Sequence, residues 1–182
     1  IWFKELPELP SKKRNKYVSQ FGLSAYDARV ISDEISMANF FEETVANGAE
    51  AKLASNWVTS DIVGYLKSNK LSFSELKLSP ENLAEMINMI SKNIISGKIA
   101  KEILPELIQK NISPKKLVEE KGLAMISDSS SILPIIDELI NEHPNEVQAF
   151  KNGKTKLLGF FVGQLMKRTK GKADPKLANK LL

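Results

Sequence analysis

The sequence predicts an all-α protein for three reasons. Apolar residues recur every three to four positions through most of its 182 residues, the spacing that places them on one face of a helix. Capping residues followed by proline, a signal of helix starts, occur at Ser79-Pro80, Ser113-Pro114 and Asp174-Pro175. Alternating β-branched residues, which are typical of strands, are scarce.

The first half of the chain opens with a connector, residues 1–10. Because the chain begins with Ile and not with Met, we expect it to be a piece of a longer protein. Gly22 ends the first helix, and Asn47-Gly48 ends the third. Ser24 with Asp27 resembles a capping pair for the second. The predicted helices cover residues 12–20, 24–31, 33–46 and 49–67, and residues 68–78 form a loop.

The second half is divided by similar local signals. Ser96-Gly97 separates two helices, and Pro105 kinks or splits the second of them. Ser127-Asp128-Ser129-Ser130 caps the helix that opens the C-terminal part. The predicted helices cover residues 80–95, 98–110, 114–121, 132–140, 146–151 and 154–170, with a last one from residue 175. We place a domain boundary near residue 120, between a helical domain, 1–120, and a small helical bundle, 121–182.

The helix predicted over residues 154–170 carries two glycines on its polar side. At about 100° per residue, its apolar residues share one broad face and a narrow basic stripe lies opposite. The apolar face holds Leu157, Leu158, Phe161, Val162, Leu165 and Met166, and the stripe holds Lys156, Gly159, Gly163, Lys167 and Lys170. A glycine inside a helix costs about 1 kcal/mol relative to alanine, so this placement needs an explanation.

Two interpretations account for the glycines. They form a groove that a phosphodiester chain could approach closely, because lysines supply charge to phosphate oxygens without reading a base. Phe160 leans to the same side and could stack on an unpaired base or ribose. Alternatively, a neighbouring helix or a partner protein packs against the glycines. Periodicity alone does not separate the two interpretations.

Charge is distributed unevenly along the chain. Nine Lys/Arg residues and one acid lie between Lys151 and Leu182, whereas Leu123–Phe150 carries five acids and neither Lys nor Arg. A second basic cluster, Lys12-Lys13-Arg14 with Lys16, is a candidate for contact with RNA or with an adjoining domain. Such clusters favour a polyanion partner, although most charge runs are solvated faces. The acidic stretch could itself cover part of the basic helix.

The sequence predicts no catalytic residues and no metal site. His143 is the only histidine and, beside Pro144, fits a helix end. Phosphate-loop and His-Glu-x-x-His motifs are missing. Without cysteine or an apolar run of membrane-span length, the chain fits a reducing compartment and no membrane. The aromatic residues at helical spacing are predicted to lie in the core: Phe40, Phe41, Trp57 and Tyr65.

Several segments resemble one known family. Gly159-Phe-Phe-Val-Gly-Gln-Leu-Met-Lys, Thr169-Lys-Gly-Lys-Ala-Asp-Pro and Asn179-Lys-Leu-Leu resemble the C-terminal, YqeY-like tail of GatB, the B component of the aspartyl/glutamyl-tRNA amidotransferases. Tyr17-Val-Ser-Gln-Phe-Gly-Leu-Ser-Ala-Tyr-Asp-Ala and Asn56-Trp-Val are similar to the helical domain of that component. The resemblance therefore covers nearly the whole chain.

This resemblance implies a cytoplasmic, non-catalytic piece of GatB, its helical domain and YqeY-like tail, which hold Glu-tRNA(Gln) or Asp-tRNA(Asn) for amidation. It also implies the A and C subunits of the amidotransferase as partners. ATP and Mg²⁺ would belong to an N-terminal domain outside this sequence, which itself would hold no cofactor. The tail would grip the outer corner of the tRNA, on its D-arm side, by shape.

On this basis we expect the basic residues of the C-terminal region to contact phosphates, with the two glycines permitting close approach. The predicted RNA-binding residues are Lys154, Lys156, Gly159, Gly163, Lys167, Arg168, Lys170, Lys172 and Lys176. The alternative is a protein-docking module, in which the stripe of Gly159 and Gly163 packs a partner helix and the lysines form its rim.

Overall fold

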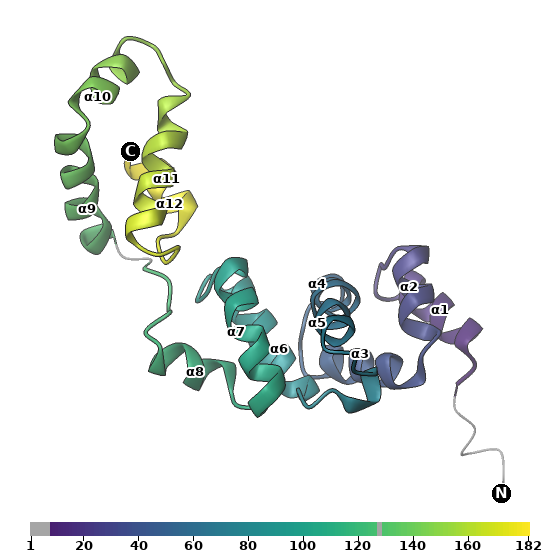
Figure 1. Cartoon of the computed structure of the whole chain (residues 1–182). Coiled ribbons are helices and arrows are strands. Elements are labelled where there is room, and N and C mark those ends of the chain that lie inside the picture. Colours follow the sequence, from purple (N-terminus) through teal and green to yellow (C-terminus); the bar gives the residue numbers. More distant parts are fainter. Residues whose placement is uncertain (1–7, 127–128) are drawn as a thin grey trace, which may run out of the picture. The chain divides into compact units, whose positions relative to one another are not determined.

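A computed structural model describes residues 8–126 and 129–182, and Figure 1 shows their arrangement. The all-α prediction is confirmed, because the described residues form helices joined by turns. Their only extended pairing is an isolated bridge between Ile126 and Ala173. Most of the predicted connector and the first two predicted capping residues, 127 and 128, lie outside the described residues.

The chain groups into two compact units. One unit combines the residues up to Ser91 with Lys101–Leu117, and the other combines Lys92–Ala100 with Val118–Leu182. The last change from one unit to the other falls between Leu117 and Val118. The domain boundary at residue 120 stays a prediction, because compactness alone does not show that either part folds independently.

The first unit is built around buried aromatic and aliphatic side chains. Phe41 is fully buried and meets the rings of Tyr17 and Phe21 edge-on, at centroid distances of 5.2 and 5.8 Å. Phe40 and Trp57 are also buried, as predicted, whereas Tyr65 is only half-buried. The helices are α1 (Pro10–Ser19), α2 (Ala25–Ser32), α3 (Ile35–Ala46), α4 (Ala51–Asn56), η2 (Trp57–Ile62), α5 (Val63–Ser68), η3 (Phe73–Glu75), α6 (Pro80–Ser91) and α7 (Gly97–Lys110).

The long helix predicted over residues 49–67 contains a π-helical segment, η2, between α4 and α5. Helical backbone angles at Asn56 and Ile62 show that the three pieces are continuous. A π-turn aligns residues five apart, so Trp57 and Ile62 both face the core. Apolar periodicity read with 3.6 residues per turn does not reveal this wider segment.

Two other predictions for this region need correction, and a third is narrowed. The loop predicted over residues 68–78 contains the 3₁₀ turn η3, which Ser72 and Glu75 close with a capping box. Helix α6 ends at Ser91 because the backbone turns left-handed at Asn93, where φ is 54°. Of the two outcomes predicted at Pro105, a kink or a split, the split does not occur, because α7 runs through this residue as one helix. Burial of apolar residues on both sides of it, at roughly 1.5–3 kcal/mol each, outweighs the cost of about 3 kcal/mol for the proline.

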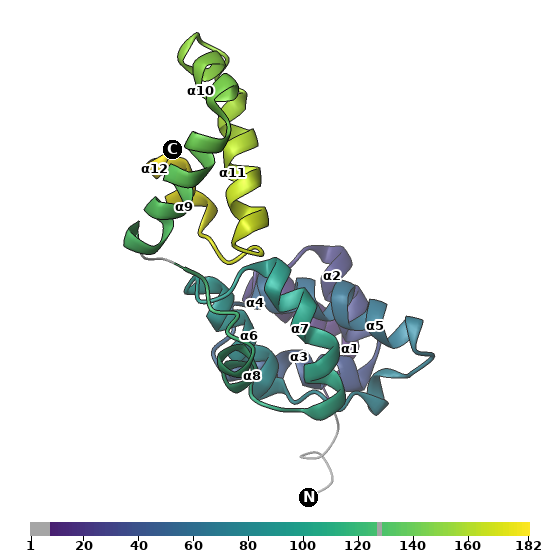
Figure 2. The ribbon, with the colours of Figure 1, turned by 60° about the vertical axis from the view of Figure 1, so that its left-hand side comes forward.

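The second unit contains a small helical bundle with its own core, which we call the tail. Its helices are α9 (Ser129–Glu142), α10 (Pro144–Lys151), α11 (Leu157–Arg168) and α12 (Pro175–Leu181), and α8 (Pro114–Glu120) precedes them. Helices α9 and α11 run side by side in both Figure 1 and Figure 2. They enclose a cluster made of Ile132, Ile136, Leu139, Leu165, Ala173 and Ala178.

Candidate nucleic-acid interface

Helix α11 presents its glycines to the surface, as the sequence predicts. Phe161 and Leu165 are buried on its apolar face, whereas Gly159 and Gly163 are exposed on the opposite side. A Cβ atom added at either glycine would meet no heavy atom within 4 Å. Within the described part of the chain, therefore, no neighbouring element packs against the glycines. The face is open to a partner.

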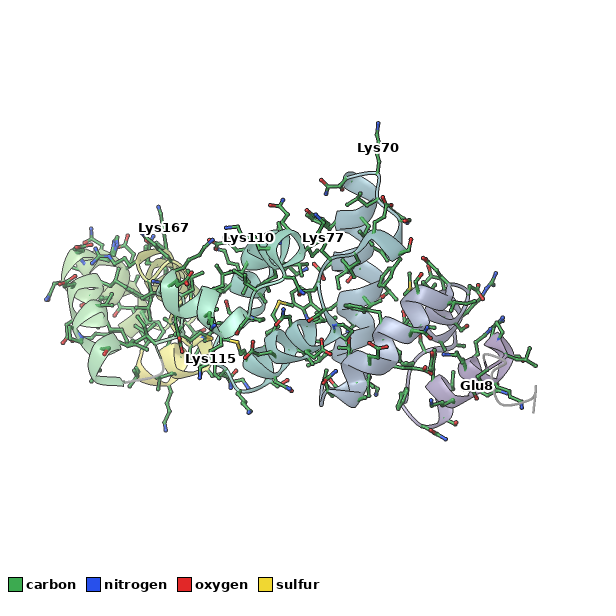
Figure 3. The ribbon with its side chains drawn as sticks, turned by 90° about the horizontal axis from the view of Figure 1, so that it is seen from below. Glu8, Lys70, Lys77, Lys110, Lys115 and Lys167 are labelled. Atoms are coloured by element: carbon green, nitrogen blue, oxygen red, sulfur yellow. The ribbon has the colours of Figure 1, made fainter. Side chains whose placement is uncertain are left out.

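Exposed lysines lie on both sides of this face in the sequence. Lys154, Lys156, Lys167, Lys170 and Lys176 are exposed, and none of them has an ion-pair partner among the described residues. Lys167 extends outward from α11 (Figure 3). Lys154 and Lys156 lie in the turn before α11 and not within the helix, which begins only at Leu157. Their charges still lie at one end of the glycine face and those of Lys167 and Lys170 at the other.

Arg168 has a different environment from these lysines. Its guanidinium donates to Glu138 Oε2 at 3.0 Å and also to Glu142, both on α9. The hydrogen bond from Arg168 lowers the pKa of Glu142. Glu138 and Glu142 lie one helical turn apart, so a single guanidinium reaches both carboxylates. Arg168 thus ties α11 to α9, and its predicted phosphate contact would have to compete with two carboxylates.

The basic turn between α11 and α12 has an ordered backbone. Lys170 and Gly171 are left-handed, with φ of 53° and 79°, which ends α11. The buried hydroxyl of Thr169 donates to the Leu165 carbonyl at 2.8 Å and accepts from the Ala173 amide at 3.2 Å. The Lys172 carbonyl accepts from the Ile126 amide at 2.7 Å, which fixes the main chain of this half-buried lysine.

Helix α12 starts as predicted. The carboxylate of Asp174 accepts from the Lys176 amide at 2.8 Å, and Pro175 occupies the first helical position. The cap uses an N–H group that a phosphate would otherwise contact. The cap therefore occupies one N–H group of this helix end, whereas the side chain of Lys176 is exposed.

Phe160, which could stack on an unpaired base, makes ring contacts within the tail. Its ring meets His143 edge-on at 5.1 Å and Phe161 at 5.4 Å, and it is half-buried in this cluster. The residue before α10, His143, contacts this ring on α11, so base stacking by Phe160 stays a prediction for the part of the ring that these contacts leave open. His143 itself precedes α10, as predicted, and its Nδ1 atom lies 3.9 Å from Oε2 of Glu146.

The second basic cluster, on α1, is engaged inside the first unit. Lys13 and Lys16 pair with Glu42 of α3 at 2.8 and 3.3 Å. Arg14 pairs with Asp33 at 3.4 Å. Three of the four cations of this cluster are therefore paired within the first unit, whereas Lys12 is exposed and has no ion-pair partner among the described residues.

Other classes of site find little support in the part of the chain that the structure describes. No group of three or more His, Cys, Asp or Glu side chains there could hold a metal ion. Among these residues, no helix is long and apolar enough to cross a membrane.

Comparison with known proteins agrees with the resemblance noted in the sequence. The GatB domain family matches residues 39–182. The chain is 99% identical, over its full length, to the B subunit of the aspartyl/glutamyl-tRNA(Asn/Gln) amidotransferase of Prochlorococcus marinus (strain AS9601). It is 61% and 60% identical to proteins of the same name from Prochlorococcus marinus (strain NATL2A) and Synechococcus sp. (strain CC9605). The chain spans 37% of the length of each of these relatives.

Proposed function

The chain belongs to the GatB domain family, and from this premise we propose that it is the tRNA-holding part of the B subunit of an aspartyl/glutamyl-tRNA amidotransferase. It would position Glu-tRNA(Gln) or Asp-tRNA(Asn) in the cytoplasm, in a complex with the A and C subunits. The proposal assigns ATP, Mg²⁺ and the chemical steps to the rest of the complex, and only binding to this chain.

One observation carries the proposal: the open face of α11, on which two exposed glycines lie between unpaired lysines. Phosphate oxygens need positive charge and close approach, and they need no base-reading side chain. The glycines remove the side chains that would keep a backbone at a distance. The lysines supply charges that no carboxylate among the described residues neutralises. An RNA backbone has the charge and the regular shape that such a face accommodates.

A protein-docking function is the second candidate. The same open space above Gly159 and Gly163 would accept a partner helix, which could pack closely against two residues without side chains. In that case the lysines would form a solvated rim. The two functions differ in their dependence on salt, because counterion release accompanies phosphate binding and not apolar docking.

We would test the proposal by titrating the chain with tRNA(Gln) and with an unrelated tRNA at several salt concentrations. One variant carries Lys156→Gln, Lys167→Gln and Lys170→Gln on the tail. A control carries Lys67→Gln, Lys70→Gln and Lys77→Gln, three exposed lysines of the first unit. Both variants lose the same net charge.

We expect binding to weaken steeply with salt, and the tail variant to lose roughly 0.9 from the logarithmic salt slope for each duplex phosphate contact removed. The control should keep the slope of the unmodified chain. An equal decrease of the salt slope in both variants would show that tRNA binding depends only on net charge. A flat salt response would reject phosphate binding and favour the docking function.

A further inference from the structure

A polar cavity lies in the first unit. Its volume is about 180 Å³, and it opens between the turn that joins α1 to α2 and one face of α4. Its lining consists of Gly22, Leu23, Ser24, Asp27, Lys52, Ser55 and Asn56. The three residues from α4 share a face because they are three and four positions apart. The functional site on the tail uses none of these residues.

Ser55 is the unusual member of this lining. The residue is 1% exposed, and no group in the described part of the chain forms a hydrogen bond with its hydroxyl. A buried hydroxyl without a partner destabilises a fold unless something that enters the site bonds to it. Most serines and threonines of the α4 to α5 region avoid this by donating to the carbonyl four residues back, as Thr59 does at 2.9 Å. Ser55 therefore leaves an unsatisfied hydroxyl in the wall of this cavity, which an entering group could pair.

The charges of the cavity are balanced. The side chain of Lys52 passes beside Gly22. A Cβ atom added to Gly22 would lie 3.4 Å from Cε of Lys52, so the absence of a side chain at Gly22 leaves room for the lysine. Asp27 accepts from the Ser24 hydroxyl through Oδ2, at 2.6 Å, which leaves its Oδ1 available. One cation and one carboxylate give no net attraction for an anion. They suit a neutral ligand whose hydroxyl groups both donate and accept hydrogen bonds.

We propose that this cavity binds the ribose of an RNA nucleotide. Asp27 would accept from a ribose hydroxyl, Lys52 and Asn56 would donate to the sugar oxygens, and Ser55 would gain its missing partner. The inference rests on the proposed function only in that RNA supplies the nucleotide.

The 2′-hydroxyl distinguishes ribose from deoxyribose, so the test compares adenosine with 2′-deoxyadenosine. Each is titrated into the isotope-labelled chain while the backbone amide signals of Ser24, Asp27 and Ser55 are followed by NMR. We expect adenosine to shift these signals and 2′-deoxyadenosine to bind about tenfold more weakly, because a hydrogen bond to a charged group is lost. Adenosine that leaves them unmoved, or equal binding of both nucleosides, would overturn the proposal.

Two variants assign the effect to the cavity. Asp27→Asn should abolish the preference for adenosine, whereas Asp137→Asn, an equal charge change on the exposed side of α9, should not. Ser55→Ala removes the unpartnered hydroxyl, so it should leave the melting temperature unchanged or raise it while weakening adenosine binding. If Ser55→Ala binds adenosine normally, the hydroxyl has no ligand and the proposal fails.

The source of the ribose and the tail function are tested separately. Saturating tRNA should displace adenosine, and adenosine that stays bound would show that the cavity takes a free nucleoside and not RNA. The tail variant with three Lys→Gln changes should bind adenosine normally. If it also keeps the full salt dependence of tRNA binding, the proposed tail function fails while the cavity stands. If it loses tRNA binding and the unmodified chain does not respond to adenosine, the cavity proposal fails while the tail function stands.

Discussion

Glu42 is the residue on which the polar side chains of α1 converge. It accepts from Lys13 at 2.8 Å, from Lys16 at 3.3 Å and from the hydroxyl of Tyr17 at 3.1 Å. Burial opposes its charge, but the hydrogen bonds and charges of the two lysines outweigh burial and lower its pKa. The pKa of Tyr17 is raised, mainly by burial and then by the charge of Glu42. One carboxylate thus joins α1 to α3.

Replacing Glu42→Gln should destabilise the first unit by about 1–3 kcal/mol at neutral pH, because Lys13 loses its partner while buried. The folded pKa of Glu42 lies below its ordinary value of 4.5, so its contribution is present above that pH. The contribution is lost as the pH falls through the folded pKa. Chemical denaturation at pH 7 and pH 3 measures both effects.

Glu43→Gln is the matched control, because Glu43 is the exposed neighbour of Glu42 on the same helix. Its free energy of unfolding should stay within about 0.5 kcal/mol of the unmodified chain at both pH values. A Glu42→Gln variant that is as stable as this control at neutral pH would contradict the assigned role.

Among the helices, α11 combines an apolar face that stabilises the tail with a glycine-bearing face that lowers the stability of the helix. Phe161 and Leu165 are buried on the apolar face, and Arg168 joins the last turn of α11 to α9 through an ion pair. On the glycine-bearing face, Gly159 and Gly163 lower helix stability without any contact in the described structure that requires them. A helix of this kind is typical of a surface that binds a partner closely, so stability and binding should respond in opposite directions.

We expect Gly159→Ala and Gly163→Ala each to stabilise the tail by about 1 kcal/mol, because alanine is the better helix former and its Cβ meets open space. If a backbone approaches there, each should also weaken tRNA binding roughly fivefold to tenfold, about 1 kcal/mol. Thermal melts and tRNA titrations of the same variants measure the two effects.

Gly64→Ala provides the control, because Gly64 is also an exposed glycine inside a helix with no atom within 4 Å of an added Cβ. It should raise stability by a similar amount and leave tRNA affinity unchanged. Unaltered tRNA binding in the two tail variants would show that nothing approaches the glycines closely.

At the scale of the whole molecule, the tail has a core of its own. The buried cluster of Ile132, Ile136, Leu139, Leu165, Ala173 and Ala178 draws every member from the C-terminal part of the chain. Residues Lys92–Ala100 also belong to this unit, and the Ile94 carbonyl accepts from the Met125 amide at 2.8 Å. A domain this small buries limited surface and is only marginally stable alone.

We predict that a fragment of residues 121–182 folds as a helical unit with a cooperative thermal transition, because its core is complete without the first unit. It should melt at a lower temperature than the same region in the full chain, since Ile94 is missing. Circular dichroism measures the helix content of the fragment and its melting temperature. A gradual, non-cooperative melt would contradict the boundary at residue 120 and assign the tail a dependence on residues 92–100.

Local signals in the sequence predicted most helices to within a few residues of their ends, and they predicted which face of α11 is apolar. Those properties depend on residues within one or two turns: Ser24 caps α2, Asp174 caps α12, and the glycines of α11 follow from a count along the helix. Which polar and aromatic side chains are engaged with other helices became clear from the packing of the helices. Arg168 meets Glu138 from 30 positions away, Lys13 meets Glu42 from 29, and Phe160 packs on His143. Such pairings depend on how the helices pack, so the spacing of residues along the chain does not predict them.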